Sequence, residues 1–337
     1  GVNDNLADGN INSTITIAVD DANSDNDFDP VADQTVTATT TDNDVAGFTI
    51  AETGGSTAVA ETGTTDTFTI VLNAQPASNV VIAMSSSDAG EATLSGTLSF
   101  TNANWNTPQT VTVTGVDDNI IDGNINSTIT ITIVDAISDN DFDAVADQTV
   151  TATTTDDDVA GFTVAQTDDS TSVAETGTTD TFTIVLNAQP ASNVVLTVTS
   201  SDTGEATVTS ALTFTNANWN TPQTVTVTGV DDNLVDGTIS STITVSVNDG
   251  SSDNNFDPVA DQTVTATTTD NDVAGFTIAQ TGGSTSVAET GTTDTFTIVL
   301  NAQPASNVVF SVSSSDTGEA TDSPSTLTFT NANWNTP

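Results

Sequence analysis

The sequence is built from a unit that recurs every 114 residues. The string TDNDVAGFTI begins at Thr41 and again at Thr269, and the variant TDDDVAGFTV begins midway between them at Thr155. The strings FTNANWNTP and GVDDN recur with nearly the same spacing. A period of this length has the size of one β-sandwich domain and is much longer than a solenoid repeat, so it predicts separate domains joined head to tail.

The phase of the repeat sets the expected boundaries. Residues 1–44 correspond to the end of one unit, 45–158 and 159–272 to two complete units, and 273–337 to the beginning of a fourth. Two interpretations of the partial units are open: the chain is a window on a longer repeat protein, or the 1–44 segment of one copy completes the 273–337 segment of another by strand complementation. We favour the window, because complementation would leave one strand without a sequence to fill it.

Apolar residues alternate with threonine along several short runs in each unit, which is the pattern of half-buried strands. In the unit that begins at Val45 the expected strands are 47–51, 67–72, 79–85, 97–101, 109–114, 127–134 and 148–154. The side chains expected to face inward are Phe68, Ile70, Leu72, Val111, Val113, Ile129, Ile131 and Ile133. Helical periodicity is absent. Seven short strands per unit predict an all-β fold, an immunoglobulin-like Greek-key sandwich.

Every ionisable side chain is acidic: the chain has 46 Asp and Glu, no Lys, Arg, His, Cys or Tyr, and a net charge of −46. Self-repulsion therefore opposes a compact state unless cations from solution neutralise the carboxylates. The composition excludes disulfides and the usual thiolate, histidine and lysine chemistry. It also argues against nucleic acid or an anionic membrane as a partner, and no apolar run is long enough for membrane insertion within this sequence.

Carboxylates are concentrated in four segments: the loops after the first, third and fifth expected strands, and the end of the last strand. Because sandwich strands alternate in direction, these four segments should meet at one pole. The candidate metal ligands in 45–158 are Glu61, Asp88, Glu91, Asp117, Asp118, Asp122, Asp156, Asp157 and Asp158. Those in 159–272 are Glu175, Asp202, Glu205, Asp231, Asp232, Asp236, Asp270 and Asp272, and residues 1–44 contribute Asp42 and Asp44.

Convergence of so many carboxylates without a cation would be unfavourable. Oxygen-only ligands suit Ca²⁺ better than a transition metal, and Mg²⁺ is disfavoured because it retains its waters. The competing interpretation is that Asp and Gly only form turns and that the acidic surface keeps the protein soluble. That interpretation explains isolated acids such as Asp20, but explains less well why the acids gather at one pole. We therefore predict Ca²⁺ as the cofactor.

A second acidic cluster, DNDFDAVAD in the first complete unit, precedes the last expected strand and so falls at the opposite pole. Its acids either complete a site at the junction with the preceding unit or form a site of their own. These secondary candidates are Asp139, Asp141, Asp143, Asp253, Asp257, Asp25, Asp27 and Asp29. In the next unit the string reads DNNFDP, in which Asn255 replaces one acid.

The unit resembles the Calx-beta repeat over its whole length. The matching features are a Glu-Thr-Gly segment after the first strand (Glu61, Glu175, Glu289), an FTIVL-type second strand, an Asp-Asp turn after a Val-Thr-Val strand, and a terminal Asp triplet. The resemblance implies Ca²⁺ ligation by Glu61, Asp117, Asp118, Asp156, Asp157 and Asp158, and by Glu175, Asp231, Asp232, Asp270 and Asp272. Asn271 departs from the triplet. Many Calx-beta repeats occur in long bacterial surface proteins.

Three functions follow as hypotheses. The first is an extracellular or cell-surface stalk or filament, bacterial in origin, whose near-identical units are rigidified by Ca²⁺ and whose partners are neighbouring units or copies of the same protein. The second is an adhesin whose units bind a carbohydrate or a protein; it predicts a variable, aromatic-rich loop, which the sequence does not contain. The third is an enzyme such as a glycosidase with paired carboxylates. Identical acidic loops in every unit argue against it, and we expect no enzymatic activity.

Overall fold

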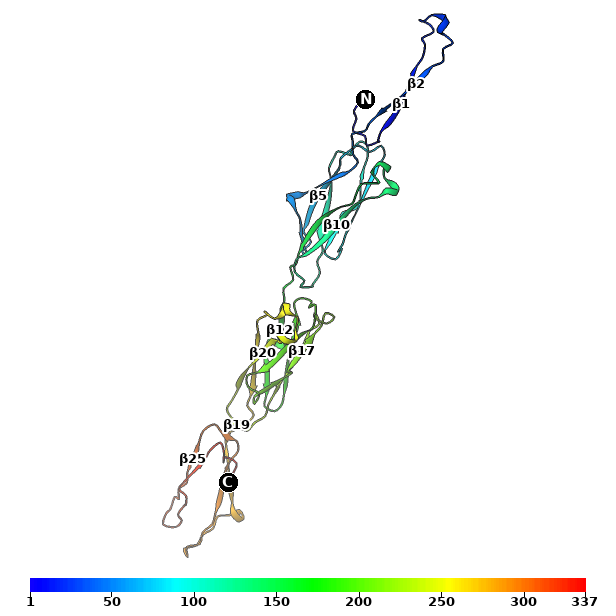
Figure 1. Cartoon of the computed structure of the whole chain (residues 1–337). Coiled ribbons are helices and arrows are strands. Elements are labelled where there is room, and N and C mark those ends of the chain that lie inside the picture. Colours follow the sequence, from blue (N-terminus) through cyan, green and yellow to red (C-terminus); the bar gives the residue numbers. More distant parts are fainter. The chain divides into compact units, whose positions relative to one another are not determined.

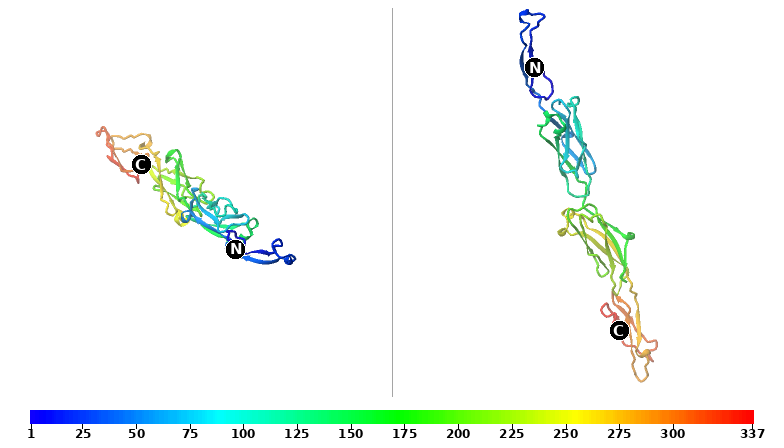
Figure 2. Two further views of the ribbon diagram at one scale, coloured as in Figure 1. Left: turned by 90° about the horizontal axis from the view of Figure 1, so that it is seen from above. Right: turned by 90° about the vertical axis from the view of Figure 1, so that its right-hand side faces the viewer.

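The computed structural model describes all 337 residues, which divide into two units, Gly1–Asp158 and Val159–Pro337. Strands and loops make up both units, with short 3₁₀ turns and no α-helix (Figure 1). Both further views in Figure 2 show the same strands and connecting loops. None of the helical turns has the length and hydropathy of a membrane-crossing helix. The prediction of an all-β fold is confirmed.

The first complete module, residues 45–158, consists of two sheets. The four-stranded sheet has the order β3 (Phe48–Glu52), β5 (Thr65–Leu72), β9 (Gln109–Gly115), β7 (Ala92–Leu94). The five-stranded sheet has the order β4 (Thr57–Ala60), β11 (Gln148–Thr155), β10 (Ile125–Ile133), β6 (Val80–Ser86), β8 (Leu98–Phe100). All neighbours are antiparallel except β4 and β11, which run parallel with Ala60 opposite Thr155. All seven expected strands are present.

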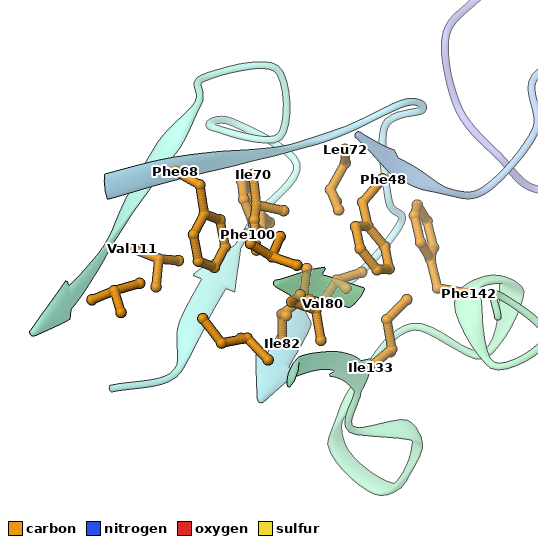
Figure 3. Packing of buried hydrophobic residues seen from close by; sticks show 14 of the residues in the cluster. Phe48, Phe68, Ile70, Leu72, Val80, Ile82, Phe100, Val111, Ile133 and Phe142 are labelled. Atoms are coloured by element: carbon orange, nitrogen blue, oxygen red, sulfur yellow. The ribbon is translucent and has the colours of Figure 1, made fainter. Parts of the chain in front are cut away.

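The core of this module lies between the two sheets, and it is built by alternation along each strand. On β5 the side chains of Phe68, Ile70 and Leu72 are buried (Figure 3), while Thr69 and Val71 between them are partly exposed. On β10 the inward residues Ile129, Ile131 and Ile133 are buried in the same way. Each fully buried side chain of this size contributes roughly 1.5–3 kcal/mol. The predicted inward face is therefore confirmed.

Two short strands were not expected. β4 has the sequence TAVA and β7 the sequence ATL, and both are too short and too poor in large apolar residues to show a period of two. They matter for the acidic loops because β4 leads directly into Glu61 and β7 follows Glu91. Each short strand therefore places one glutamate.

The second complete module, residues 159–272, has the same strand order in both sheets. Its four-stranded sheet is β12 (Phe162–Gln166), β14 (Thr179–Leu186), β18 (Gln223–Gly229), β16 (Ala206–Val208). Its five-stranded sheet is β13 (Thr171–Ala174), β21 (Gln262–Thr269), β20 (Ile239–Val247), β15 (Val194–Ser200), β17 (Ala211–Phe214).

The remaining strands, apart from β19, lie in residues 1–44 and 273–337. Residues 1–44 form the hairpin β1 (Ile11–Ile17) and β2 (Gln34–Thr40). Residues 273–337 contain β22 (Phe276–Gln280), β23 (Phe296–Leu300), β24 (Gln303–Pro304), β25 (Val308–Ser311) and β26 (Thr326–Phe329). Apolar side chains that are buried in complete modules are exposed here: Phe276 is 49% exposed, whereas its counterpart Phe162 is 2% exposed. β19 (Leu234–Val235) lies in the loop before β20.

The 3₁₀ turns are η1 (Asn26–Phe28), η2 (Thr53–Gly55), η3 (Asp135–Ile137), η4 (Asn140–Phe142), η5 (Thr167–Asp169), η6 (Asp249–Ser251), η7 (Asn254–Phe256) and η8 (Thr281–Gly283).

The turn η5 carries backbone strain that its counterparts avoid. Asp168 and Asp169 have φ of 54° and 61°, in the left-handed region, where the equivalent turn of the first complete module has Gly54 and Gly55. An L side chain is disfavoured there and glycine is not. We expect the double change Asp168→Gly and Asp169→Gly to raise the free energy of unfolding of residues 159–272 by about 1 kcal/mol.

Hydrogen exchange measured by mass spectrometry on peptides from each module will report the change, because the two modules differ in sequence around this turn. The reciprocal substitution, Gly54→Asp with Gly55→Asp, is the matched control and should lower protection in residues 45–158. Effects of the same sign in both variants would contradict the argument from backbone strain.

Candidate metal centre

The acidic pole of each complete module is the end at which β4, β9 and β11, or β13, β18 and β21, terminate. In the first complete module, Glu61 follows β4, Glu91 precedes β7, Asp122 lies between β9 and β10, and Asp156 and Asp158 follow β11. The four segments that sequence analysis assigned to one pole therefore meet there.

Glu61 is directed into the pole by the parallel pairing of β4 and β11. Its amide donates to the carbonyl of Thr155 at 3.1 Å, which extends the strand pairing by one residue. Gly115, at the end of β9, passes so close to β4 that a Cβ added there would lie 2.1 Å from the Ala60 carbonyl oxygen. Only glycine permits this approach. As a result the Glu61 side chain is 1% exposed.

Asp156 joins two of the converging segments. Its Oδ2 accepts from the amide of Gly123 at 2.7 Å, and its Oδ1 accepts from the amide of Asp158 at 2.8 Å. Asp270 makes the same pair of bonds in the second complete module, to Gly237 and Asp272. The amide donors hold the pKa of Asp270 below its ordinary value. Asp270 thus remains ionised while it fixes the loop.

Carboxylates gather into two groups at each acidic pole, and ligand oxygens within a group lie within 4.8 Å of one another. The glutamate-pair group is Glu61, Glu91 and Asp122 in the first complete module and Glu175, Glu205 and Asp236 in the second. The terminal group is Glu61, Asp156 and Asp158 in the first and Glu175, Asp232 and Asp272 in the second. Glu61 and Glu175 belong to both groups of their module, so each lies at the centre of its pole.

Several oxygens in these groups are buried without a hydrogen-bond partner. They are Glu61 Oε2, Glu91 Oε2, Asp158 Oδ2, Glu205 Oε2, Asp236 Oδ1 and Asp272 Oδ2. A buried carboxylate oxygen without a donor is strongly unfavourable, and the chain has no cationic side chain to provide one. Six convergent oxygens of this kind, three in each complete module, fit a hard divalent cation with oxygen ligands.

Burial and mutual repulsion also raise the affinity of the carboxylates in these groups for protons. Burial, together with the charge of Asp156, raises the pKa of Glu61 to about 7. Burial, with the charge of Asp236, raises the pKa of Glu205 to about 7. Burial first and neighbouring carboxylates second also raise the pKa of Glu91 and Glu175. The pole therefore has a high affinity for positive charge in either form, proton or metal.

The other predicted ligands of this pole lie beside the groups. Asp88 and Asp202 each accept from the amide two residues ahead, at 2.9 Å, and so form turns. Asp118 Oδ1 accepts from the Ile120 amide at 2.7 Å. Asp231 Oδ1 accepts from the Asn271 side-chain amide at 2.8 Å. Asp117 and Asp157 are exposed and belong to neither group.

In residues 1–44, Asp42 makes the hydrogen bonds that Asp156 makes in the first complete module. Its Oδ2 accepts from the amides of Asp8 and Gly9, at 3.1 and 2.8 Å, and its Oδ1 accepts from Asp44 at 2.8 Å. Sequence analysis overlooked Asp8, although subtraction of one 114-residue period from Asp122 leads to it. Burial and the charges of Asp4, Asp42 and Asp141 raise the pKa of Asp8.

The secondary candidates lie at the opposite pole and are not brought together with either group. Asp139 is buried; its Oδ2 accepts from the Ser78 amide at 2.6 Å and its Oδ1 from the Asp141 amide at 3.1 Å. It thereby anchors η4, whose Phe142 is fully buried against the core (Figure 3). Asp253 and Phe256 repeat this arrangement. Asp143 and Asp257 end these turns, and Asp25, Asp27 and Asp29 belong to the exposed turn η1.

No family model matches the sequence, and no curated protein matches it. Similar solved structures include the CBD12 region from CALX1.2, 14% identical over 58% of this chain and 79% of that one, with a TM-score of 0.25. Calcium-binding domain CBD12 of CALX1.1 is 15% identical over 59% and 80%, with a TM-score of 0.27. Domains 4–9 of surface layer protein SbsC are 20% identical over 74% and 35%, with a TM-score of 0.24.

Proposed function

We propose that the chain is a series of immunoglobulin-like modules that bind Ca²⁺ at their acidic poles and serve as the repeated spacer of an extracellular stalk or filament. The observation that carries the metal assignment is the set of buried, unpartnered carboxylate oxygens in the two groups of each pole. A cation would satisfy these oxygens and remove the repulsion between the converging loops.

Ca²⁺ is the cation that these donors fit best. All of the donors are carboxylate oxygens, with no imidazole or thiolate in the chain, which disfavours zinc and other transition metals. Oxygens come from loops that are distant in sequence, so the cage can adjust to the larger coordination number of Ca²⁺. In the first complete module we assign the ligands Glu61, Glu91, Asp122, Asp156 and Asp158, with Asp118 and Asp157 beside them.

The spacer role is inferred from repetition and composition. Near-identical modules are suited to setting length, whereas a binding function would favour loops that differ between modules. A chain without Lys or Arg is not cleaved by trypsin-like proteases, which suits an extracellular setting. The proposal gives the acidic groups a structural role and no catalytic one.

Isothermal titration calorimetry of the full chain with CaCl₂ tests the metal assignment. We expect four sites, one for each of the four carboxylate groups. The paired variant Glu61→Gln and Glu175→Gln should weaken binding at least tenfold, because each glutamate belongs to both groups of its module. The matched control, Asp135→Asn with Asp249→Asn, removes two exposed charges remote from the groups and should leave affinity unchanged. Equal affinities in both variants would refute the assignment.

A further inference from the structure

The loop that carries the acidic groups also contacts the following module, and it does so in the same way in both units. Within Gly1–Asp158, Leu6 pairs in parallel with Gln75; the Gln75 amide donates to the Asn5 carbonyl at 2.7 Å and the Ala7 amide to the Gln75 carbonyl at 3.1 Å. Within Val159–Pro337, β19 pairs in parallel with β24. There the Gln303 amide donates to the Asn233 carbonyl at 2.6 Å.

An apolar side chain anchors each of these contacts. Ala7 is 4% exposed and packs in the core cluster of residues 45–158, which includes Phe48 and Ala74. Val235, its counterpart, lines a cavity with Phe276 and Leu300. The receiving end of the module therefore combines backbone hydrogen-bonding groups with apolar surface, which is the combination that β-strand addition requires.

The receiving loop is held in place by its own module. The Gln75 side-chain amide donates to the Asn102 carbonyl at 2.8 Å, and Gln303 donates to Asn331 at 2.9 Å. Gln189 makes the same bond to Asn216, at 3.1 Å, in the second complete module. The glutamine side chain thus locks the loop to the neighbouring turn and leaves its backbone amide free to pair with another segment.

The docking segments are flanked by acids of the metal centre. Asn233–Val235 lies directly between Asp232, of the terminal group, and Asp236, of the glutamate-pair group. Asp232 Oδ1 also accepts from the amide of Leu234 at 2.6 Å, so this carboxylate holds the paired residue itself. Asp4 holds Leu6 in the same way, at 3.2 Å.

We infer that residues 5–7 and 233–235 are docking strands that join successive modules, and that cation binding to the acids on either side holds them in the paired conformation. The partner is another copy of the module, recognised through the backbone of its Ala-Gln-Pro loop. This inference rests on the proposed function for its metal, while the pairing itself is independent of it. Without a cation, repulsion between Asp232, Asp236 and Asp270 would spread the loop and release the strand.

Disulfide trapping tests the inference, because the chain has no cysteine of its own. Residues opposite each other on paired strands lie within the Cα separation that a disulfide spans. The test pairs are Leu6→Cys with Gln75→Cys and Leu234→Cys with Gln303→Cys. Their register-shifted controls place the second cysteine two residues further on, as Ala77→Cys and Ala305→Cys, in full chains otherwise identical.

In saturating Ca²⁺ the test pairs should oxidise at least tenfold faster than the controls. Removal of Ca²⁺ with EDTA should abolish this preference for both test pairs, and the further change Asp232→Asn with Asp236→Asn, which removes the repulsion, should restore it in EDTA for the pair at 234 and 303 alone. Equal rates for test and control pairs would overturn the docking strands. An unchanged preference in EDTA, with Ca²⁺ binding intact in the calorimetry, would overturn the coupling alone. Absence of Ca²⁺ binding would instead refute the proposed function.

Discussion

Removal of divalent cations with EDTA should lower the melting temperature of the chain by about 15 °C at pH 7.5. A ligand at 1,000 times its dissociation constant stabilises the folded state by roughly 4 kcal/mol, and a domain of this size loses about 4 °C per kcal/mol. Each pole has two carboxylate groups with unpartnered oxygens, so the loss of cations exposes the full repulsion between its loops. Differential scanning calorimetry with and without EDTA measures the shift.

Two controls separate this effect from general screening of a highly acidic chain. Excess NaCl added to the EDTA sample screens exposed charges but does not provide a ligand for buried oxygens, so it should restore only a small part of the shift. The variant Glu61→Gln with Glu175→Gln should melt at similar temperatures in EDTA and in Ca²⁺. Full recovery in NaCl would show that screening, and not a specific site, stabilises the protein.

The stability of the chain should respond to pH in opposite directions with and without Ca²⁺. Glu61 and Glu205 have folded-state pKa values of about 7, above the ordinary value of 4.5. Between those values the folded state binds more protons than the unfolded state. In EDTA this stabilisation is therefore fully present below about pH 4.5 and is lost as pH rises through 7. We expect a loss on the order of 1 kcal/mol per glutamate, because solvent at the pole screens part of the ~1.4 kcal/mol that each pKa unit represents.

In saturating Ca²⁺ the pH dependence of stability reverses, so that stability falls as the pH is lowered. Protons then compete with the metal for the same oxygens, and acidification displaces the metal. Urea unfolding at pH 5, 6, 7 and 8 in both conditions measures the two slopes. The lowered pKa values of Asp42 and Asp270 act only below about pH 4 and do not enter this range. Glu61→Gln with Glu205→Gln should flatten the slope in EDTA. Parallel slopes in EDTA and Ca²⁺ would contradict the prediction.

The strands and the core could be predicted because they depend on a local pattern. Alternation along β5 and β10 identified the buried faces of Phe68 and Ile129 without knowledge of any partner strand. The convergence of acidic loops was also predictable, since it follows from the alternating direction of the strands. The short strand β4 was not: its four residues carry too little pattern, and its place is set by parallel pairing with β11.

The part of the site that sequence reasoning missed depends on contacts between distant residues. In DNDFDAVAD we predicted that the acids were candidate metal ligands. The structure of this loop instead depends on the buried Phe142 and on the hydrogen bond from the Ser78 amide to Asp139. The sequence alone contains no sign that the Asp139 carboxylate is occupied by backbone amides. Likewise, the pairing of Leu6 with Gln75 joins two loops, and loops have no periodicity from which a register could be read.

The parallel pairing of β4 with β11 has a mechanical consequence. β4 lies near the beginning of its module and β11 at the end, so tension applied to the two ends of the module pulls these neighbours in opposite directions along their length. Several hydrogen bonds must then break together in shear, instead of one at a time as in an unzipping hairpin. Glu61 and Asp156 follow directly on these two strands. A cation bound between these two residues would cross-link the strands at the point where rupture begins.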